Sequence, residues 1–214
     1  MWRITAKAAI PKNCLTNLKI KNYEKYLNKF NVIRVDMQIF SDKYNDINSM
    51  IDRITKEIIF ELKKCFSKIT FFDETDLPHC FDDIYNETKE QFVFIIDEWD
   101  SVIRNHVSDD KTKKPYLNFI RDLLKGKQYV SLAYMTGILP IRKYGQHSMP
   151  NMFDEYAITN AVPLSEFSGF TEEETKILCD KYNMSYNDMK EWYDGYNVDG
   201  ISIYNPNSVV TAMT

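Results

Sequence analysis

Two acidic residues directly follow an apolar run near the middle of the chain. Asp97 and Glu98 come after residues 92–96, which read FVFII. An unbroken apolar run of this length is typical of a buried strand, which would hold both carboxylates at the edge of a sheet. Phosphoryl transfer needs Mg²⁺ to neutralise the phosphates and a group that orients the attacking water. We therefore predict that Asp97 holds the hydration shell of a metal ion and that Glu98 orients a water. The alternative is a buried strand that ends in an acidic turn.

A second apolar segment carries polar and basic residues at its carboxyl end. In residues 131–143 (SLAYMTGILPIRK), Thr136 and Gly137 follow the apolar part, and Arg142 and Lys143 come a few residues later. A cation beside the γ-phosphate stabilises the charge of the transferred group. We therefore predict that Thr136 contributes to nucleotide binding and that Arg142 has a catalytic sensor role. A solvated basic loop remains the alternative for Arg142.

Alternating strand and helix patterns position these residues. The hydrophobic spacing predicts helices at 15–30, 47–69 and 81–88, and a helix that has Pro115 in its first turn and runs to about 125. Strands are predicted at 32–37, 92–96, 129–135 and 156–164. Such alternation favours a three-layer α/β domain with a mainly parallel sheet and helices on both faces. In these folds the chemistry gathers at the carboxyl ends of the strands.

The pattern changes after Ser165. Thr171 and Glu174 have the spacing of a capping box, Ser185 is typical of a second helix cap, and Asn205-Pro206 indicates a third helix start. We therefore predict an α/β core at 1–164 and a helical region at 165–214. This region is expected to be truncated, because the sequence stops before its last helix is long enough to bury an apolar face. The aromatic residues of this region are expected to pack between it and the core, and they are Trp192, Tyr193 and Tyr196.

Composition and charge exclude several functional classes. The net charge of −4 and the pI near 5.5 provide no general signal for nucleic-acid binding. The four cysteines have no paired spacing suited to zinc or to a redox couple. The start of the chain lacks the apolar run of a signal peptide, and no stretch of eighteen apolar residues occurs. We expect a soluble cytoplasmic protein that does not enter a membrane.

Several motifs in this order resemble one bacterial family. FIIDEWD, YMTGILPIRK, LSEFSGFTEEE, WYDGY and YNPNSVV look like segments of the AAA-ATPase-like family that is often linked to a C-terminal PD-(D/E)XK nuclease-like domain. LTNLKI and NVIRVDMQIF also fit, so the resemblance runs from about Leu15 to the last residue. It implies a P-loop NTPase-like fold of the additional-strand class, with Asp97 and Glu98 as the Walker B acids and with ATP and Mg²⁺ as ligands. Glu166 and Asp194 belong to family motifs without an assigned role.

The sequence departs from the family pattern at the phosphate-binding loop. The family places a G-x-x-x-x-G-K-[ST] loop before the LTNLKI segment, and the 214 residues contain no such loop. The only Gly-Lys pair, Gly126-Lys127, lacks the upstream glycine and is predicted to end a helix. The nuclease-like domain is absent too. The expectation is a truncated ATPase fragment that does not hydrolyse ATP alone; the alternative is a non-enzymatic remnant or an interaction module that docks to a partner chain.

The resemblance also implies a sheet order of 5-1-4-3-2, in which the absent P-loop strand counts as the first. Its loss would open a slot between the strand at 129–135 and the strand near 156–164. Unpaired strand edges attract other strands. We therefore expect self-association, or a partner chain that supplies the P-loop strand. Alternatively Met1 to Ala6, which alternates Trp2, Ile4 and Ala6, fills the slot, or the two flanking strands pair directly.

Overall fold

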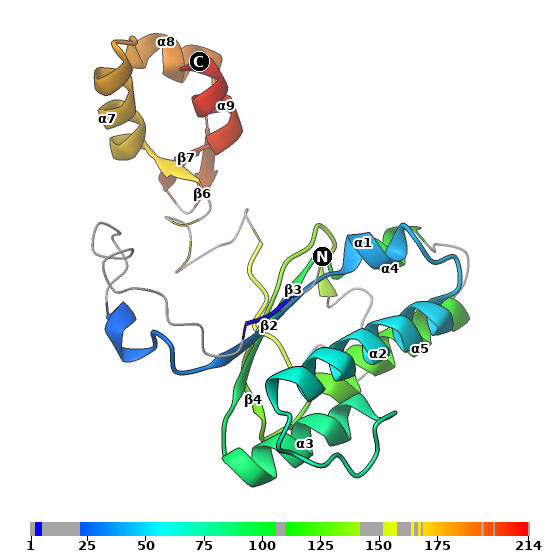
Figure 1. Ribbon diagram of the computed structural model, residues 1–214. Helices are drawn as coiled ribbons and strands as arrows, with labels where there is room; N and C mark the ends of the chain where they lie inside the picture. Colours follow the sequence, from blue (N-terminus) through cyan, green and yellow to red (C-terminus); the bar gives the residue numbers. More distant parts are fainter. Residues whose placement is uncertain are drawn as a thin grey trace. The chain divides into compact units, whose positions relative to one another are not determined.

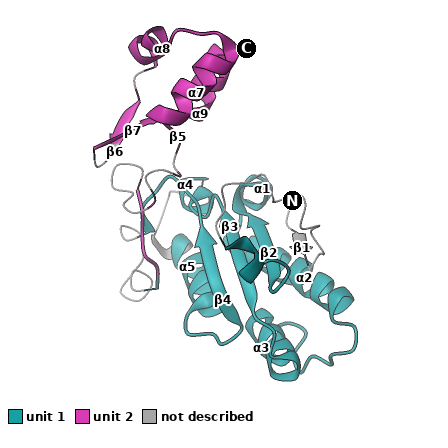
Figure 2. Cartoon of the chain, turned by 90° about the vertical axis from the view of Figure 1, so that its left-hand side faces the viewer, with its two compact units in different colours: residues 1–152 teal, residues 153–214 magenta. Residues whose placement is uncertain are grey.

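The computed structural model describes residues 3–5, 22–105, 110–141, 152–157, 164, 167, 169–193, 195–198 and 200–213. The chain forms two compact units, Met1–Met152 and Phe153–Thr214, which Figure 2 shows in different colours. None of the helices in the described ranges is long and apolar enough to cross a membrane.

A four-stranded sheet forms the centre of unit 1. Its strands are β1 (Arg3–Thr5), β2 (Asn31–Asp36), β3 (Phe92–Asp97) and β4 (Val130–Met135), and their order is β1-β2-β3-β4. β2, β3 and β4 are parallel, as the alternation of strands and helices predicts, and their order agrees with the 4-3-2 part of the expected sheet. β2 pairs with β3 from Asn31↔Phe92 to Asp36↔Asp97, so both strands end in an aspartate at the same edge.

Helices connect the parallel strands of unit 1 (Figure 1). They are α1 (Met37–Ser41), α2 (Ile47–Cys65), α3 (Leu77–Thr88), α4 (Ser101–Asn105) and α5 (Asp110–Leu124). Three of them start at an aspartate whose side chain accepts a backbone N–H of the first turn: Asp36 for α1, Asp46 for α2 and Asp76 for α3. The helices expected at 47–69 and 81–88 are therefore confirmed, with shifted ends.

The prediction of helices on both faces of the sheet is not met by the described residues. Along β3, Phe92, Phe94 and Ile96 are buried, whereas Val93 and Ile95 are half-buried. The fully buried residues face a core that α2, α3 and α5 share. A continuous apolar run matches both kinds of strand, because one-sided burial requires only every second residue to be apolar. The run in β3 is therefore confirmed as a strand, and helices on both of its faces stay a prediction.

β1 corrects the prediction for the first residues of the chain. A strand does form at Arg3–Thr5, inside the range Met1 to Ala6, but it does not pair with β4. It lies antiparallel along β2, with Ile4 opposite Ile33. The outer edge of β2 offers unpaired backbone groups just as the edge of β4 does, and a three-residue alternating pattern cannot distinguish the two edges.

Two helix predictions also need correction. Pro115 lies inside α5 rather than in its first turn, because the helix begins at Asp110. Proline there removes one backbone hydrogen bond, and the buried side chains of Tyr116 and Ile120 hold the rest of the helix against the core. Of the helix expected at 15–30, the structure describes residues 22–30, which contain only the 3₁₀ turn η2 (Tyr23–Lys25).

Unit 2 contains more strand than the sequence predicts. Its described elements are β5 (Phe170–Thr171), α7 (Glu172–Tyr182), α8 (Tyr186–Trp192), β6 (Tyr196–Val198), β7 (Ile201–Tyr204) and α9 (Pro206–Ala212), and the strands form an antiparallel sheet in the order β5-β7-β6. The capping box of Thr171 and Glu174 and the helix caps Ser185 and Asn205 are confirmed. The expected strand at 156–164 lies largely outside the described residues.

The core of unit 2 is small. It is formed by the buried side chains of Cys179, Met189, Tyr204 and Val209. Three aromatic side chains of unit 2 are exposed, Trp192 by 78%, Tyr193 by 38% and Tyr196 by 59%. On α8 the buried residue is Met189. The predicted packing of these aromatic residues against the core of unit 1 stays a prediction.

Candidate functional site

The carboxyl edge of the parallel strands brings Asp97 and Thr136 together. The Thr136 hydroxyl donates a hydrogen bond to Oδ1 of Asp97. The backbone continues the pairing of β3 and β4 past their ends, because Thr136 N donates to the Ile96 carbonyl at 3.0 Å and Trp99 N donates to the Thr136 carbonyl at 3.0 Å. The acid at the end of β3 and the hydroxyl after β4 therefore form one rigid pair.

β2 adds two charged residues that the sequence reasoning missed. Asp36 is the register partner of Asp97, and its Oδ1 accepts the Gln38 N–H at 3.0 Å. Arg34 reaches from the same strand to Asp97, with 3.4 Å between its Nη2 and Oδ2 of the carboxylate. The aspartate at the end of an apolar strand, in NVIRVD, is the same signal that identified Asp97 and could have identified Asp36.

Glu98 has an unusual backbone conformation for its residue type. Its φ of 52° lies in the left-handed region, which non-glycine residues rarely occupy. Its carboxylate accepts a hydrogen bond from Nη2 of Arg104 on α4. Glu98 thus departs from the extended backbone of β3, and its side chain forms an ion pair with a residue of the next helix. Sequence spacing alone does not predict this pair.

Asp100 ties the DEWD segment to the turn after β4. Its side chain is fully buried, and Oδ2 accepts the backbone N–H of Ile138 at 3.2 Å and of Leu139 at 2.9 Å. The same oxygen accepts Nε of Arg104 at 3.0 Å. Oδ1 is buried and has no hydrogen-bond partner in the described part of the chain.

Gly137 allows the two segments to approach this closely. A Cβ at residue 137 would lie 2.5 Å from Oδ1 of Asp100 and 2.7 Å from the ring of Trp99. Trp99 is itself held by Tyr116, whose hydroxyl donates to the Trp99 carbonyl at 2.7 Å. Burial raises the pKa of Tyr116 far above its usual range, so this hydroxyl keeps its proton and remains a donor. A glycine is therefore required where the Thr136 turn meets the acidic segment.

The oxygen donors at this edge suit a hard divalent cation. Asp97, Asp36 and Thr136 offer carboxylate and hydroxyl oxygens, which Mg²⁺ prefers over nitrogen or sulfur. No group of three or more acidic, His or Cys side chains that could enclose a metal occurs among the described residues.

Other residues named from the sequence lie outside the described part of the chain. These are Arg142, Lys143, Glu166 and Asp194, and their predicted roles stay predictions. The last described residue before Arg142 is Ile141, whose side chain is buried. Gly126, by contrast, follows α5 with a φ of 67°, which agrees with its predicted role in ending a helix.

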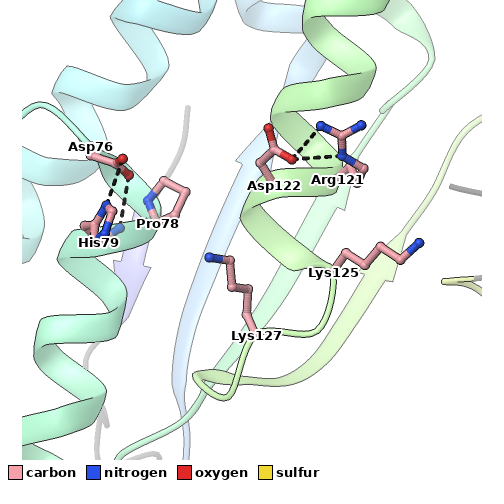
Figure 3. A pocket seen from close by; sticks show the side chains of 7 residues that line it. All are labelled: Asp76, Pro78, His79, Arg121, Asp122, Lys125 and Lys127. Atoms are coloured by element: carbon pink, nitrogen blue, oxygen red, sulfur yellow. Dashed lines mark hydrogen bonds and ion pairs between the residues drawn. The ribbon is translucent and has the colours of Figure 1, made fainter. Parts of the chain in front are cut away.

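A surface pocket of about 360 Å³ lies elsewhere on unit 1 (Figure 3). It is formed by the start of α3, the end of α5 and Lys127, which precedes β4, so it lies toward the amino ends of the strands. Two of the four basic residues shown are paired with acids that are also shown: His79 contacts Asp76 at 2.9 Å, and Arg121 contacts Asp122 at 2.8 Å. The hydrogen bond that the His79 side chain donates to Asp76 raises the pKa of His79. The pocket therefore lies apart from Asp97 and Thr136.

Part of this chain is similar in sequence to known proteins. The family model described as a predicted AAA-ATPase matches residues 5–146, which include Asp97, Glu98 and Thr136. An "Uncharacterized protein in vnfD 5'region" from Azotobacter chroococcum mcd 1 is 23% identical over 123 residues. The match covers 55% of this chain and 23% of that protein, so the chain spans about a quarter of the relative's length. No solved structure matches.

Proposed function

This chain belongs to the predicted AAA-ATPase family, and from that premise we propose that the edge formed by Asp97, Glu98 and Thr136 is the Mg²⁺ side of an ATP-binding site. We assign the sheet to the P-loop NTPase-like fold of the additional-strand class, an assignment that the parallel order of β2, β3 and β4 supports. The hydrogen bond between Thr136 and Asp97 is the single observation that carries the site, because it joins an acid and a hydroxyl from neighbouring strands.

Each residue of this edge has a distinct role in the proposal. Bound Mg²⁺ would neutralise the charge of the phosphates. Asp97 would hold Mg²⁺ through a water of its hydration shell, and Thr136 fixes the carboxylate by hydrogen bonding to Oδ1. Arg34 holds the other oxygen of Asp97. Glu98 orients the attacking water, and Arg142 stabilises charge on the transferred group. The amides that cradle phosphates come from a segment outside these 214 residues, so the chain alone is expected to release no phosphate from ATP.

A metal-binding measurement tests the proposal without requiring catalysis. We expect Asp97→Asn to weaken Mn²⁺ binding about tenfold, because an amide oxygen carries no charge to hold the hydrated cation. Mn²⁺ takes the same oxygen ligands as Mg²⁺, and its binding is measured by the relaxation of water protons. Asp122→Asn is the matched control, since Asp122 is an exposed aspartate in an ion pair away from the site. Equal losses in the two variants would refute the assignment of Asp97.

A second candidate function is an interaction module that docks to another chain. The surface of β4 favours it, because Leu132 and Tyr134 are each 56% exposed and Ile138, in the turn that follows, is 71% exposed. No charged residue occurs between Tyr129 and Leu139. Strands at the edge of a sheet commonly carry charged residues or prolines, which prevent pairing with a further strand. The composition of β4 is instead that of an interior strand. A partner that supplies an apolar strand would cover this surface.

Self-association gives a direct test of this candidate. We expect the purified chain to form dimers or larger species at micromolar concentration, and we expect Tyr134→Lys to shift it toward monomer, because a lysine on β4 repels an apolar strand. Sedimentation velocity measures both. Phe72→Lys is the control, because Phe72 is 92% exposed and lies in the loop before α3. If the unaltered chain is a monomer at all concentrations, or if both variants dissociate it equally, β4 is not the docking surface.

A further inference from the structure

The pocket between α3 and α5 contains a lysine whose charge is only partly satisfied. Nζ of Lys127 lies 3.7 Å from Oδ2 of Asp82, which is longer than a hydrogen bond. Its ammonium group donates no hydrogen bond to any residue in the described ranges, although its side chain is only 28% exposed. An ammonium group has three N–H donors, and burying it is costly unless they are paired. Lys127 therefore has donors left for a ligand.

We propose that this pocket binds a small molecule that carries a phosphate monoester, and that Lys127, Arg121 and His79 hold the phosphate group. The pocket lies toward the amino ends of the strands, so this site is separate from the proposed Mg²⁺ edge of Asp97 and Thr136. The inference does not depend on the proposed function.

The turn between α5 and β4 holds Lys127 in place. The Lys127 carbonyl accepts the Val130 N–H at 3.2 Å. Tyr129 is fully buried, and its hydroxyl donates to the Leu123 carbonyl at 2.6 Å. The Tyr129 ring stacks on Phe81 of α3, with 5.0 Å between the centroids. The turn and α3 therefore share one packed core, and a preformed site loses little binding energy to the ordering of its side chains.

The start of α3 supplies a second donor. Oδ1 of Asp76 accepts the His79 backbone N–H at 3.1 Å, and Oδ2 lies 2.9 Å from Nδ1 of the His79 ring. The ring is thus oriented through Nδ1, and its Nε2 has no hydrogen-bond partner in the part of the chain that the structure describes. The contact with Asp76 raises the pKa of His79, which favours the form with a proton on both nitrogens. In this form Nε2 donates a hydrogen bond and carries positive charge.

The end of α5 supplies a third donor. Nε and Nη2 of Arg121 both contact Oδ1 of Asp122 at 2.8 Å. The Asp122 side chain is 58% exposed, so water weakens this ion pair and Arg121 loses little by turning to another anion. An arginine fork binds phosphate through two of its N–H groups. Figure 3 shows Lys127 between the start of α3 and the end of α5, so a phosphate there would meet cations from both helices.

The size and the charges of the pocket indicate the class of ligand. Its volume of about 360 Å³ exceeds what a phosphate ion fills and is typical of small-molecule sites, so an organic group fits beside Pro78. The anion must compete with the carboxylate of Asp82 for Lys127. A phosphate monoester carries more charge than a carboxylate and has three acceptor oxygens, one for each of the three donors.

A phosphate titration of the whole chain tests the site. We expect Lys127→Gln to weaken the binding of inorganic phosphate about tenfold, because it removes the cation that has no other hydrogen-bond partner among the described residues. Proton–nitrogen correlation NMR follows the titration through the backbone amide of His79. Lys56→Gln is the matched control, since Lys56 is exposed, pairs with Asp52 on α2 and changes the net charge equally. Equal losses in the two variants overturn the proposal.

The carboxylate beside Lys127 gives a test of opposite sign. Asp82→Asn should strengthen phosphate binding about threefold to tenfold, because the phosphate then has no competitor for Lys127. Asp52→Asn changes the net charge equally but lies in an exposed ion pair on α2, so it should leave the affinity nearly unchanged. Equal gains in the two variants would show a general effect of net charge and would sink the site.

The choice of anion tests the ligand class. Acetate should bind at least about tenfold more weakly than phosphate, and phenyl phosphate should bind about threefold more tightly, because its ring contacts Pro78. Acetate that binds as well as phosphate, or phenyl phosphate that binds more weakly, overturns the assignment of a phosphate monoester. Shifts confined to amides around Asp97 and Thr136 overturn the location. If circular dichroism shows that Lys127→Gln does not fold, Arg121→Gln replaces it, with an expected loss of about threefold.

Discussion

Replacing Phe81 with alanine is expected to lower the free energy of unfolding of unit 1 by about 3–5 kcal/mol. Phe81 is fully buried in an aromatic cluster. The centroid of its ring lies 4.9 Å from that of Phe92, 5.2 Å from that of Phe94 and 5.0 Å from that of Tyr129. Truncation removes buried apolar surface and leaves a cavity that these large rings cannot fill without leaving their rotamers. Urea unfolding followed by near-ultraviolet circular dichroism measures the loss directly.

Phe72 provides the control for Phe81. It is the same residue type and lies nine positions earlier, but it is exposed, so Phe72→Ala should change the free energy of unfolding by no more than about 0.5 kcal/mol. Comparable losses in the two variants would mean that α3 does not pack against the sheet through Phe81, and the described core of unit 1 would then be wrong.

Asp100→Ala is expected to cost about 3–5 kcal/mol, as is usual when one partner of a buried ion pair is removed. The variant leaves the Ile138 and Leu139 N–H groups without their acceptor and Arg104 without one of its two carboxylates. Thermal and urea unfolding both report the loss. The expected result is large because no solvent reaches the side chain of Asp100, so water cannot replace the missing oxygen.

The control for Asp100 is another aspartate next to an arginine. Asp122 is exposed and binds Arg121 at 2.8 Å, so Asp122→Ala should cost no more than about 1 kcal/mol. Asp100→Asn adds a further comparison, since the amide oxygen can still accept the two backbone N–H groups and should retain part of the stability. A loss in Asp100→Ala as small as that in Asp122→Ala would show that the turn after β4 does not depend on Asp100.

Local patterns in the sequence predicted most elements of the core correctly. The apolar runs at 92–96 and 129–135 and the helical spacing from 47 onward identified β3, β4 and α2, because periodicity reports which side chains a strand or helix can bury. The helix caps of unit 2 were also predicted, since a capping side chain contacts only residues of its own first turn.

The hairpin of unit 2 was missed although its signal was present. Asp199-Gly200 separates the short strands β6 and β7, and this dipeptide between apolar residues favours a tight hairpin turn. Gly200 has the positive φ of 84° that such turns require, and its N–H is accepted by the Asn197 side chain. The acidic helices around it dominated the composition, so the whole region was predicted as helical.

The contacts of the candidate site could be predicted only in part. Asp97 and Thr136 follow adjacent parallel strands, so strand order alone brings them together. The pairing of Glu98 with Arg104 depends on the left-handed backbone at Glu98, which no residue type in DEWD signals. The burial of Asp100 likewise depends on the close approach that Gly137 permits. Sequence spacing does not encode either of these backbone conformations.

The register of the central sheet sets the order in which the chain can fold. Asn31 pairs with Phe92, and Phe92 pairs with Val130, so β2 and β3 each pair with a strand that is synthesised later, after a helical connection. Closing such long loops costs conformational entropy before any contact rewards it, which makes parallel pairing slow. β2 leaves the ribosome well before β3. Until β3 arrives, the apolar residues of β2, among them Ile33 and Val35, have no strand of the parallel sheet to cover them, and chaperones bind such segments.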